Sequence, residues 1–260
     1  MALVTLKNLS FTYPNGNHRA LSDISLTIES GAFVTLMGAT GSGKSTLLRL
    51  LKPELRQNGN ITGTALFDGE EITMLSPRDS ARRIGYVAQN PDEQLVTDKV
   101  WHELAFTLEN LGYKRADIAR RVGETAAYFD LEPLMERDTS TLSGGEKQLL
   151  NLAAVMATDP ELLLLDEPTA QLDPIAAARF IDTIHRLNRE TGVTVLICEH
   201  RTEELSRSPT ALSFSITDSS HLTIYPAGSP KASAVTARIP PSCPRRRASS
   251  IRSAAGERSL

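Results

Sequence analysis

The feature that most constrains this chain is a glycine-rich segment, residues 38–45, which reads Gly-Ala-Thr-Gly-Ser-Gly-Lys-Ser and fits the pattern G-x-x-x-x-G-K-[ST]. A β-prone apolar run precedes it, and leucines at helical spacing follow it and stop before Pro53. Glycines let the backbone curl so that several N–H groups point at phosphate oxygens, and the following helix presents its positive N-terminal end to the same anion. A chance glycine-rich turn is the alternative, but the flanking strand and helix favour a phosphate-binding loop.

This loop supplies most of the candidate nucleotide-binding residues. Lys44 carries a full positive charge for the β- and γ-phosphates, and the hydroxyl of Ser45 suits Mg²⁺. We therefore expect a nucleoside triphosphate, with Mg²⁺, as the ligand. The residues predicted to bind it here are Gly38, Ala39, Thr40, Gly41, Ser42, Gly43, Lys44, Ser45 and Thr46.

Two adjacent acids, Asp166 and Glu167, follow four consecutive leucines at 162–165. The leucines predict a fully buried strand, and the carboxyl end of such a strand is where open α/β sheets place their ligands. We expect Asp166 to hold Mg²⁺, directly or through water, and Glu167 to polarise the attacking water as a general base. A helix cap or an exposed turn is the alternative for this pair, and the phosphate loop makes it the weaker one.

The order of β-prone and helical segments predicts the fold class. Short β-prone runs at 4–6 and 24–28 indicate an antiparallel region, whereas buried apolar runs at 162–165 and 193–198 indicate parallel strands covered on both faces. We predict an α/β fold: a P-loop NTPase core with a mainly parallel sheet, an N-terminal antiparallel β subdomain and an inserted helical subdomain at about 95–158.

Composition limits the other functions to consider. The net charge of −3 does not favour nucleic acid as a partner, and no stretch approaches the ~20 apolar residues that cross a bilayer. The first residues lack a signal peptide, and two cysteines make no disulfide framework in a chain of this length. Cys198 lies in an apolar run and is expected to be a small buried hydrophobe. We expect a cytoplasmic protein whose membrane role comes through partners.

Residues 142–148, Leu-Ser-Gly-Gly-Glu-Lys-Gln, are the discriminating segment. Ser143 suits a helix cap, and Gly144 and Gly145 let the backbone approach a phosphate closely, so the segment suits a second anion site. A plain capping box formed by Ser143 and Glu146 is the structural alternative. Together with the loop and the acids, this segment resembles the signature of the ABC ATPase family. The resemblance implies that it grips the γ-phosphate held by another subunit, so that hydrolysis of ATP requires a dimer.

The resemblance covers about residues 2–205 and implies four more roles. Gln89 resembles the glutamine that senses Mg²⁺ and couples to the membrane partner, and Asp173 resembles the aspartate that faces across the dimer. His200 resembles the switch histidine at the γ-phosphate, and Tyr13 resembles the aromatic that stacks on adenine. A structural histidine and a packing tyrosine are the alternatives. The predicted catalytic residues are Glu167, His200 and Gln89, the metal site is Ser45, Gln89 and Asp166, and Tyr13, Ser143, Gly144, Gly145 and Asp173 join the nucleotide-binding set.

Within the family, residues 89–94, 169–174 and 199–201 resemble the energy-coupling factor ATPases, which power uptake of vitamins or of cobalt and nickel ions. This resemblance implies a second ABC ATPase subunit, identical or different, and integral membrane coupling and substrate-binding components as partners. It places the chain at the cytoplasmic face of the membrane. Residues 92–104 are the expected docking surface, and an amphipathic helix that packs on its own domain is the alternative.

The resemblance ends before the C-terminus. We interpret 1–226 as the ABC ATPase domain and 227–260, which holds seven Lys or Arg and one Glu and no aromatic residue, as a basic, disordered tail. A non-transport ABC ATPase and a regulatory nucleotide-binding module are the competing functions.

Overall fold

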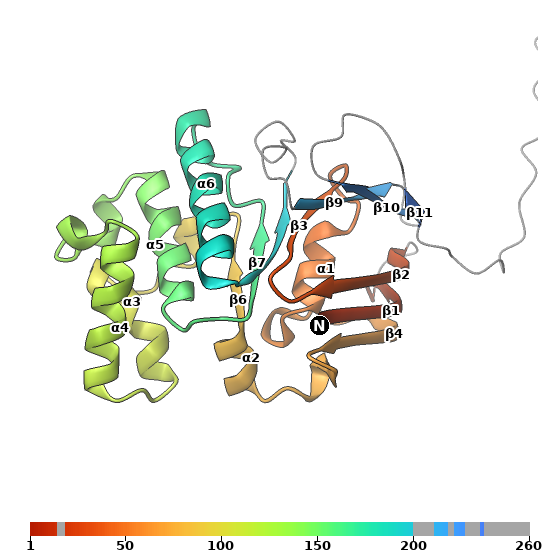
Figure 1. Cartoon of the computed structure of the whole chain (residues 1–260), viewed down its shortest axis with the longest axis horizontal. Helices are drawn as coiled ribbons and strands as arrows, with labels where there is room; N and C mark the ends of the chain where they lie inside the picture. The colour runs from red at the N-terminus through yellow and green to blue at the C-terminus, as the bar shows by residue number, and fades with distance from the viewer. Residues whose placement is uncertain (15–18, 200–210, 218–220, 227–234, 237–260) are drawn as a thin grey trace, which may run out of the picture.

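The computed structural model describes residues 1–14, 19–199, 211–217, 221–226 and 235–236, and side chains are described up to Glu199. Two sheets and an insert of helices make up the fold (Figure 1). The strands are β1 (Ala2–Thr12), β2 (Arg19–Glu29), β3 (Phe33–Met37), β4 (Asn60–Phe67), β5 (Glu70–Glu71), β6 (Ile84–Val87), β7 (Leu162–Asp166), β8 (Thr194–Cys198), β9 (Ala211–Thr217), β10 (His221–Pro226) and β11 (Val235–Thr236). The α-helices are α1 (Lys44–Leu50), α2 (Pro77–Arg83), α3 (Val100–Asn110), α4 (Arg115–Tyr128), α5 (Gly144–Met156) and α6 (Pro174–Thr191).

The first sheet is antiparallel, in the order β2-β1-β4-β5. Apolar residues face inward at alternating positions of β2, which is the pattern of a sheet with one face on a core and one in water. Val4 and Leu6 of β1 and Phe67 of β4 are buried in that core. This is the N-terminal antiparallel subdomain expected from the sequence, with β1 and β2 each extending over 11 residues.

The second sheet runs β11-β10-β9-β3-β8-β7-β6, and its five strands from β9 to β6 are parallel. All five residues of β7 and all five of β8 are buried, as expected for strands covered on both faces. Successive leucines of β7 belong to different cores. Leu163 and Leu165 face the helical side, whereas Leu162 and Leu164 face the antiparallel sheet. The central sheet thus lies between two hydrophobic cores, and its carboxyl edge is held from both sides.

The helices α3, α4 and α5 form the inserted helical subdomain between β6 and β7 (Figure 1). Leu104, Leu108 and Leu150 are fully buried where these helices meet. The predicted α/β fold with its helical insert is therefore confirmed. Among the described residues, no helix combines the length and the apolar character that a membrane crossing needs.

Two features of the fold add to the sequence-based expectations, and a third agrees with them. Helix α2 was not expected; it begins at Pro77 after Ser76, whose hydroxyl accepts from the N–H of Asp79. In the segment 227–260, which was expected to be disordered, β11 pairs antiparallel with β10 at Val235 and Thr236, and both are β-branched residues that favour strands. The other residues of that segment lie outside the described part of the chain. Cys198 is buried with no disulfide, as expected.

The imidazole of His185 on α6 packs against the central sheet. Its ring stacks on Phe33 of β3 with centroids 4.1 Å apart, and its Nε2 is buried with no hydrogen-bond partner among the described residues. Burial lowers the pKa of His185 below its ordinary value of 6.5, and Arg189 contributes in the same direction against Asp182. The folded protein therefore favours the neutral ring.

We predict that the free energy of unfolding falls as the pH drops below about 6.5, because the unfolded chain then binds a proton that the folded chain resists. Urea unfolding at about pH 7.5 and about pH 5.5 measures this loss, which His185→Gln should reduce. His102→Gln, at a histidine whose side chain is 42% exposed, is the control. Equal pH dependence in both variants would contradict the assignment to His185.

Candidate nucleotide-binding site

The phosphate loop connects β3 to α1, as the sequence predicts. Gly43 is the N-cap of α1 and has a φ of 94°, in the left-handed region that favours glycine. A Cβ there would lie 2.4 Å from the backbone oxygen of Ala20. No larger residue fits this position without moving β2, so the glycine of the motif is required by both conformation and space.

Lys44 lies inside the loop, and only 4% of the residue is exposed. Its Nζ donates to the carbonyl oxygens of Gly38, at 2.9 Å, and of Ala39, at 3.1 Å. The Oγ of Ser42 is buried with no hydrogen-bond partner among the described residues, although it is a polar atom that normally has one. A phosphate oxygen held by this loop would accept from Ser42 and Lys44, so the loop fits the predicted ligand.

Asp166 stands at the carboxyl end of β7 and accepts two hydrogen bonds. Ser45 Oγ donates to its Oδ1 at 2.7 Å, and Tyr86 Oη donates to its Oδ2 at 3.0 Å. The described residues contain no group of three or more His, Cys, Asp or Glu that would hold a metal by themselves. A hydroxyl and one carboxylate are nevertheless the set that suits Mg²⁺ when substrate phosphates complete its octahedron. The two residues therefore fit the predicted metal.

Glu167 has a φ of 49°, in the left-handed region that non-glycine residues seldom adopt. Its N–H donates to the carbonyl of Cys198 at the end of β8, which fixes the turn. Its Oε1 lies 4.0 Å from Lys44 Nζ, and Gln89 Nε2 donates to its Oε2 at 3.5 Å. Uncommon backbone geometry of this kind gathers at functional sites. The loop lysine and both predicted catalytic residues of the described chain thus meet at one edge of the sheet.

Tyr13 lies beside the same loop. Its Oη is 2.8 Å from Oγ1 of Thr46, and its ring packs edge-to-face on Phe11, with centroids 4.8 Å apart. The ring is partly exposed. Stacking of adenine on this ring remains a prediction, and the contact with Phe11 shows that Tyr13 also has a packing role.

Ser143 caps α5 with both bonds of a capping box. Its Oγ accepts from the N–H of Glu146 at 3.3 Å, and Glu146 Oε2 accepts from the N–H of Ser143 at 2.7 Å. These bonds lower the pKa of Glu146. The structural alternative is therefore present, but the N–H groups of Gly144 and Gly145 are not used by the box, and a Cβ on Gly144 would meet nothing within 4 Å. The start of α5 remains open to an anion.

Asp173 caps α6, where its Oδ1 accepts from the N–H groups of Ile175 and Ala176 at 2.9 and 3.0 Å. Asp173 and Ser143 line one cavity of about 400 Å³ between α5 and α6. None of the phosphate-loop residues lines it. The structure therefore brings together two groups of predicted residues: the loop with Asp166, Glu167 and Gln89, and the signature with Asp173. His200 lies outside the described residues.

Sequence reasoning missed the side chains that hold the loop after β6. Gln94 accepts from the N–H of Ala88 at 2.9 Å and donates to the carbonyl of Tyr86 at 2.8 Å. Gln148 of α5 donates to the carbonyl of Ala88 at 3.1 Å, and Lys147 pairs with Asp92 at 2.6 Å. These contacts tie the segment that carries Gln89 to the helix that begins at Ser143. The glutamines that make these contacts follow no recognisable spacing in the sequence, so no local pattern predicts that they hold this loop.

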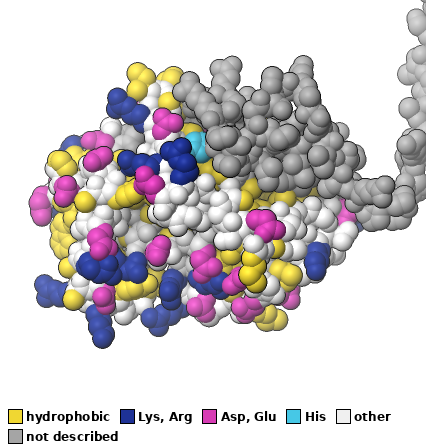
Figure 2. Space-filling model, viewed as in Figure 1, with side chains coloured by type: hydrophobic (Ala, Val, Ile, Leu, Met, Phe, Trp, Pro, Cys, Tyr) yellow, Lys and Arg dark blue, Asp and Glu magenta, His cyan; other side chains and the backbone are white. Residues whose placement is uncertain are grey.

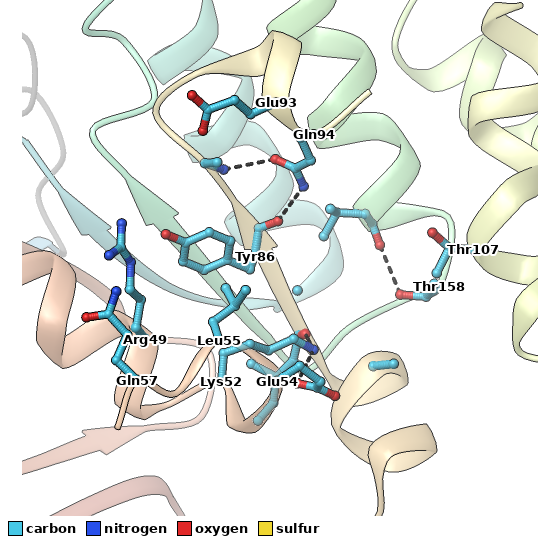
Figure 3. Close-up of a pocket in the computed structure, with 15 residues that line it drawn as sticks. Arg49, Lys52, Glu54, Leu55, Gln57, Tyr86, Glu93, Gln94, Thr107 and Thr158 are labelled. Carbon is cyan, nitrogen blue, oxygen red and sulfur yellow. Dashed lines mark hydrogen bonds and ion pairs between the residues drawn. The ribbon is translucent and has the colours of Figure 1, made fainter. Parts of the chain in front are cut away.

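A groove of about 560 Å³ opens beside this segment, between the end of α1, β6 and the helical subdomain (Figure 3). We call it the Tyr86 groove. Figure 3 shows the Tyr86 ring directed toward Arg49, with Gln94 above and Thr107 and Thr158 across the opening. Burial raises the pKa of Tyr86, and the negative charge of Asp166 adds to the effect, so its hydroxyl remains a donor. Tyr86 therefore lines the groove and also donates to Asp166, the carboxylate that is predicted to hold Mg²⁺.

A parallel sheet with a phosphate loop after β3, and with an acid pair at the end of β7, defines a P-loop nucleotide-binding domain. Comparison with known proteins gives the family. The ABC transporter family model matches residues 21–170, and the chain belongs to that family.

Two curated relatives and two solved structures illustrate the likeness. An ABC transporter ATP-binding protein of Bacillus anthracis is 47% identical over 205 residues, which cover 79% of this chain and 37% of that relative. The energy-coupling factor transporter ATP-binding protein EcfA1 of Latilactobacillus sakei is 39% identical over 203 residues, which cover 78% of this chain and 71% of EcfA1. The chain thus spans little more than a third of the first relative and most of the second.

The structure of cbiO1 from Clostridium perfringens, described as part of the ABC transporter complex cbiONQ, has a TM-score of 0.78 and 26% identity. The match covers 87% of this chain and 89% of cbiO1. The ATP-binding cassette MJ0796, a dimer in a post-hydrolysis state bound to ADP and Pi, has a TM-score of 0.71 and 25% identity, with 84% and 96% covered. The fold and the family therefore agree with the resemblance found in the sequence.

Proposed function

We propose that this chain is the ATP-binding and ATP-hydrolysing domain that energises a membrane transporter of the energy-coupling factor type. The observation that carries the proposal is the meeting of Lys44, Ser45, Asp166, Glu167 and Gln89 at one edge of the central sheet. The likeness to EcfA1 and to cbiO1 supports the branch of the family.

The proposed roles of the site residues follow from their charges. The loop N–H groups and the ammonium of Lys44 bind the β- and γ-phosphates of ATP, and Ser42 adds a hydroxyl. Mg²⁺ bound at Ser45 and Asp166 supplies positive charge that offsets the charge of the phosphates. Tyr86 and Ser45 hold Asp166 in one orientation for that purpose.

Glu167 is the proposed base. Its carboxylate lies beside the ammonium of Lys44, and therefore beside the position of the terminal phosphate that Lys44 binds. Gln89 donates to it and holds its orientation. A water molecule between this carboxylate and the γ-phosphate would lose a proton to Glu167 as it attacks.

The signature residues complete the site in a second subunit. Ser143 and Gly144 are exposed, and no residue of the phosphate loop lines the cavity that Ser143 borders with Asp173. The open N-terminal end of α5 suits the γ-phosphate of ATP bound by another copy or by a related subunit. The dimeric state of MJ0796 supports this arrangement.

The Tyr86 groove is the proposed docking site for a cytoplasmic segment of the membrane partner. It joins the segment that carries Gln89 to the helical subdomain, so an occupant contacts elements that also contact the nucleotide site. Of the expected surface at 92–104, Glu93 and Gln94 line the groove, whereas Val100 and Leu104 are buried in the helical core. The chain would then lie at the cytoplasmic face of the membrane, held there by its partners.

We predict that Lys44→Met, which keeps the apolar stem but removes the charge, weakens ATP binding at least tenfold. Each lost charge-assisted hydrogen bond is worth about 1.5–3 kcal/mol. Calorimetric titration of the isolated chain measures the affinity. Lys7→Met, at an exposed lysine of β1, is the control for lost charge. Unchanged affinity in Lys44→Met would refute the assignment of the phosphate loop.

We predict that Glu167→Gln retains ATP binding while hydrolysis slows by about 10²–10⁴-fold, because the amide cannot take the proton. Phosphate release and nucleotide affinity are measured on the same preparation. Glu132→Gln, at an exposed glutamate of the helical subdomain, should hydrolyse ATP at the unchanged rate. Full hydrolysis by Glu167→Gln would remove this residue as the base.

We predict that Ser143→Asp stops hydrolysis without weakening ATP binding to one subunit. Aspartate keeps the cap of α5, so the free energy of unfolding should change little, but its charge repels the phosphate of the opposite subunit. Ser143→Asn, a neutral cap, should retain more activity than Ser143→Asp. Equal activity in the two variants would contradict a second anion site.

A further inference from the structure

A further cavity, distinct from the nucleotide site, the Tyr86 groove and the cavity between α5 and α6, lies where α2, the end of α3 and the start of α4 meet. We call it the basic cavity. It has a volume of about 420 Å³, and its charged lining consists of Arg78, Arg82, Lys114 and Arg121 with a single carboxylate, Asp117. Four positive charges and one negative charge therefore share one hollow on the surface.

None of these four cations forms an ion pair with a described residue, whereas two neighbouring arginines do. Arg83, next to Arg82, pairs with Glu161 at 2.6 Å, and Arg120, next to Arg121, pairs with Glu124 at 2.8 Å. Arg83 and Arg120 are thus neutralised by carboxylates, whereas the four cations that line the cavity are not.

Two of the four cations are held in place by neutral partners. Arg78 donates to the carbonyl of Leu111 at 2.8 Å. Arg121 donates to the carbonyl of Ala157 at 3.1 Å and lies over the ring of Tyr113, 5.2 Å from its centroid. Their positions are fixed without any loss of charge. Guanidinium groups held in this way present further N–H donors to an anion with several oxygens.

The basic cavity adjoins the Tyr86 groove. Helix α2 contributes Ala81 to the groove and Arg82 to the cavity, and α3 with its end contributes Thr107 to the groove and Leu111 to the cavity. Figure 2 shows Lys and Arg side chains, interspersed with Asp and Glu, along the lower edge of the molecule, where Figure 1 places α2 and α4. A membrane partner seated in the groove would bring this edge close to the lipid surface.

We propose that the basic cavity binds the phosphate group of an anionic phospholipid. The inference rests on the proposed function, because it takes the Tyr86 groove to face the membrane. Unpaired cations near the cytoplasmic leaflet are attracted to anionic headgroups, and each contributes roughly a fivefold gain in binding. Two positioned guanidinium groups in a concave site also favour a bound phosphate group over the general negative charge of the membrane surface.

The experiment uses flotation of the isolated chain with phosphatidylcholine vesicles that do or do not contain phosphatidylglycerol, in about 0.1 M salt. The test variant is Arg82→Gln with Lys114→Gln, since neither side chain makes a hydrogen bond or ion pair within the described chain. The control is Lys7→Gln with Arg120→Gln, which removes the same charge from exposed positions outside the cavity.

We expect the wild type and the control to float with phosphatidylglycerol vesicles and the test variant to bind them about 25-fold more weakly. Equal flotation of the two double variants would overturn the proposal, because general charge would then explain the binding. Nuclear magnetic resonance could instead show inorganic phosphate bound at Arg82 and Lys114 while the wild type does not float with vesicles. The cavity would then bind free phosphate, and the proposal that its ligand is a phospholipid would be overturned.

ATP binding by the test variant is measured in the same preparations. If ATP binding and hydrolysis are normal but flotation does not depend on the cavity, the lipid proposal is wrong and the proposed function is unaffected. The proposed function fails separately if the wild-type chain neither binds nor hydrolyses ATP, whatever the result with vesicles.

Discussion

The hydrogen bond from Ser45 to Asp166 joins two parts of the chain that are 121 positions apart. It connects the first turn of α1 to the end of β7, and it determines where a cation can lie relative to the phosphate loop. The bond exists because β7 is buried on both faces, with Leu163 and Leu165 in one core and Leu162 and Leu164 in the other. Movement of β7 would disturb both cores, so the carboxylate is positioned by the packing of the whole domain.

Those parts of the site that lie in contiguous segments could be predicted from the sequence. The loop at 38–45, the acid pair after the leucines and the serine before α5 each carry their local structure in a few neighbouring residues. The buried strands were predictable for the same reason, because a short run of four consecutive leucines is typical of a strand covered on both faces. The signature illustrates a limit of this reasoning. The same residues suit both a capping box and an anion site, and the box that forms leaves the Gly144 and Gly145 N–H groups unused.

Features that depend on contacts between distant segments could not be predicted. Tyr86 is 80 residues away from Asp166, and Gln148 is 60 residues away from Ala88. The first contact depends on the pairing of β6 with β7, and the second depends on how the helical subdomain packs against the sheet. No spacing in the sequence indicates either one. The basic cavity is a similar case, since Arg82 and Lys114 come from different helices and neither belongs to a recognised motif. The role of His200 remains a prediction.

Tyr86 belongs to two surfaces at the same time. Its ring lines the groove beside Arg49, and its hydroxyl donates a hydrogen bond to Asp166. The Tyr86 side chain can rotate about only two torsion angles, and its ring is otherwise rigid. A helix inserted into the groove that displaced the ring would therefore also move the hydroxyl that donates to the carboxylate oxygen. Under the proposed function, a partner bound in the groove would therefore alter the geometry around the proposed Mg²⁺ site. A transporter built on this domain would have a route, a single side chain long, from its membrane-facing surface to its catalytic chemistry.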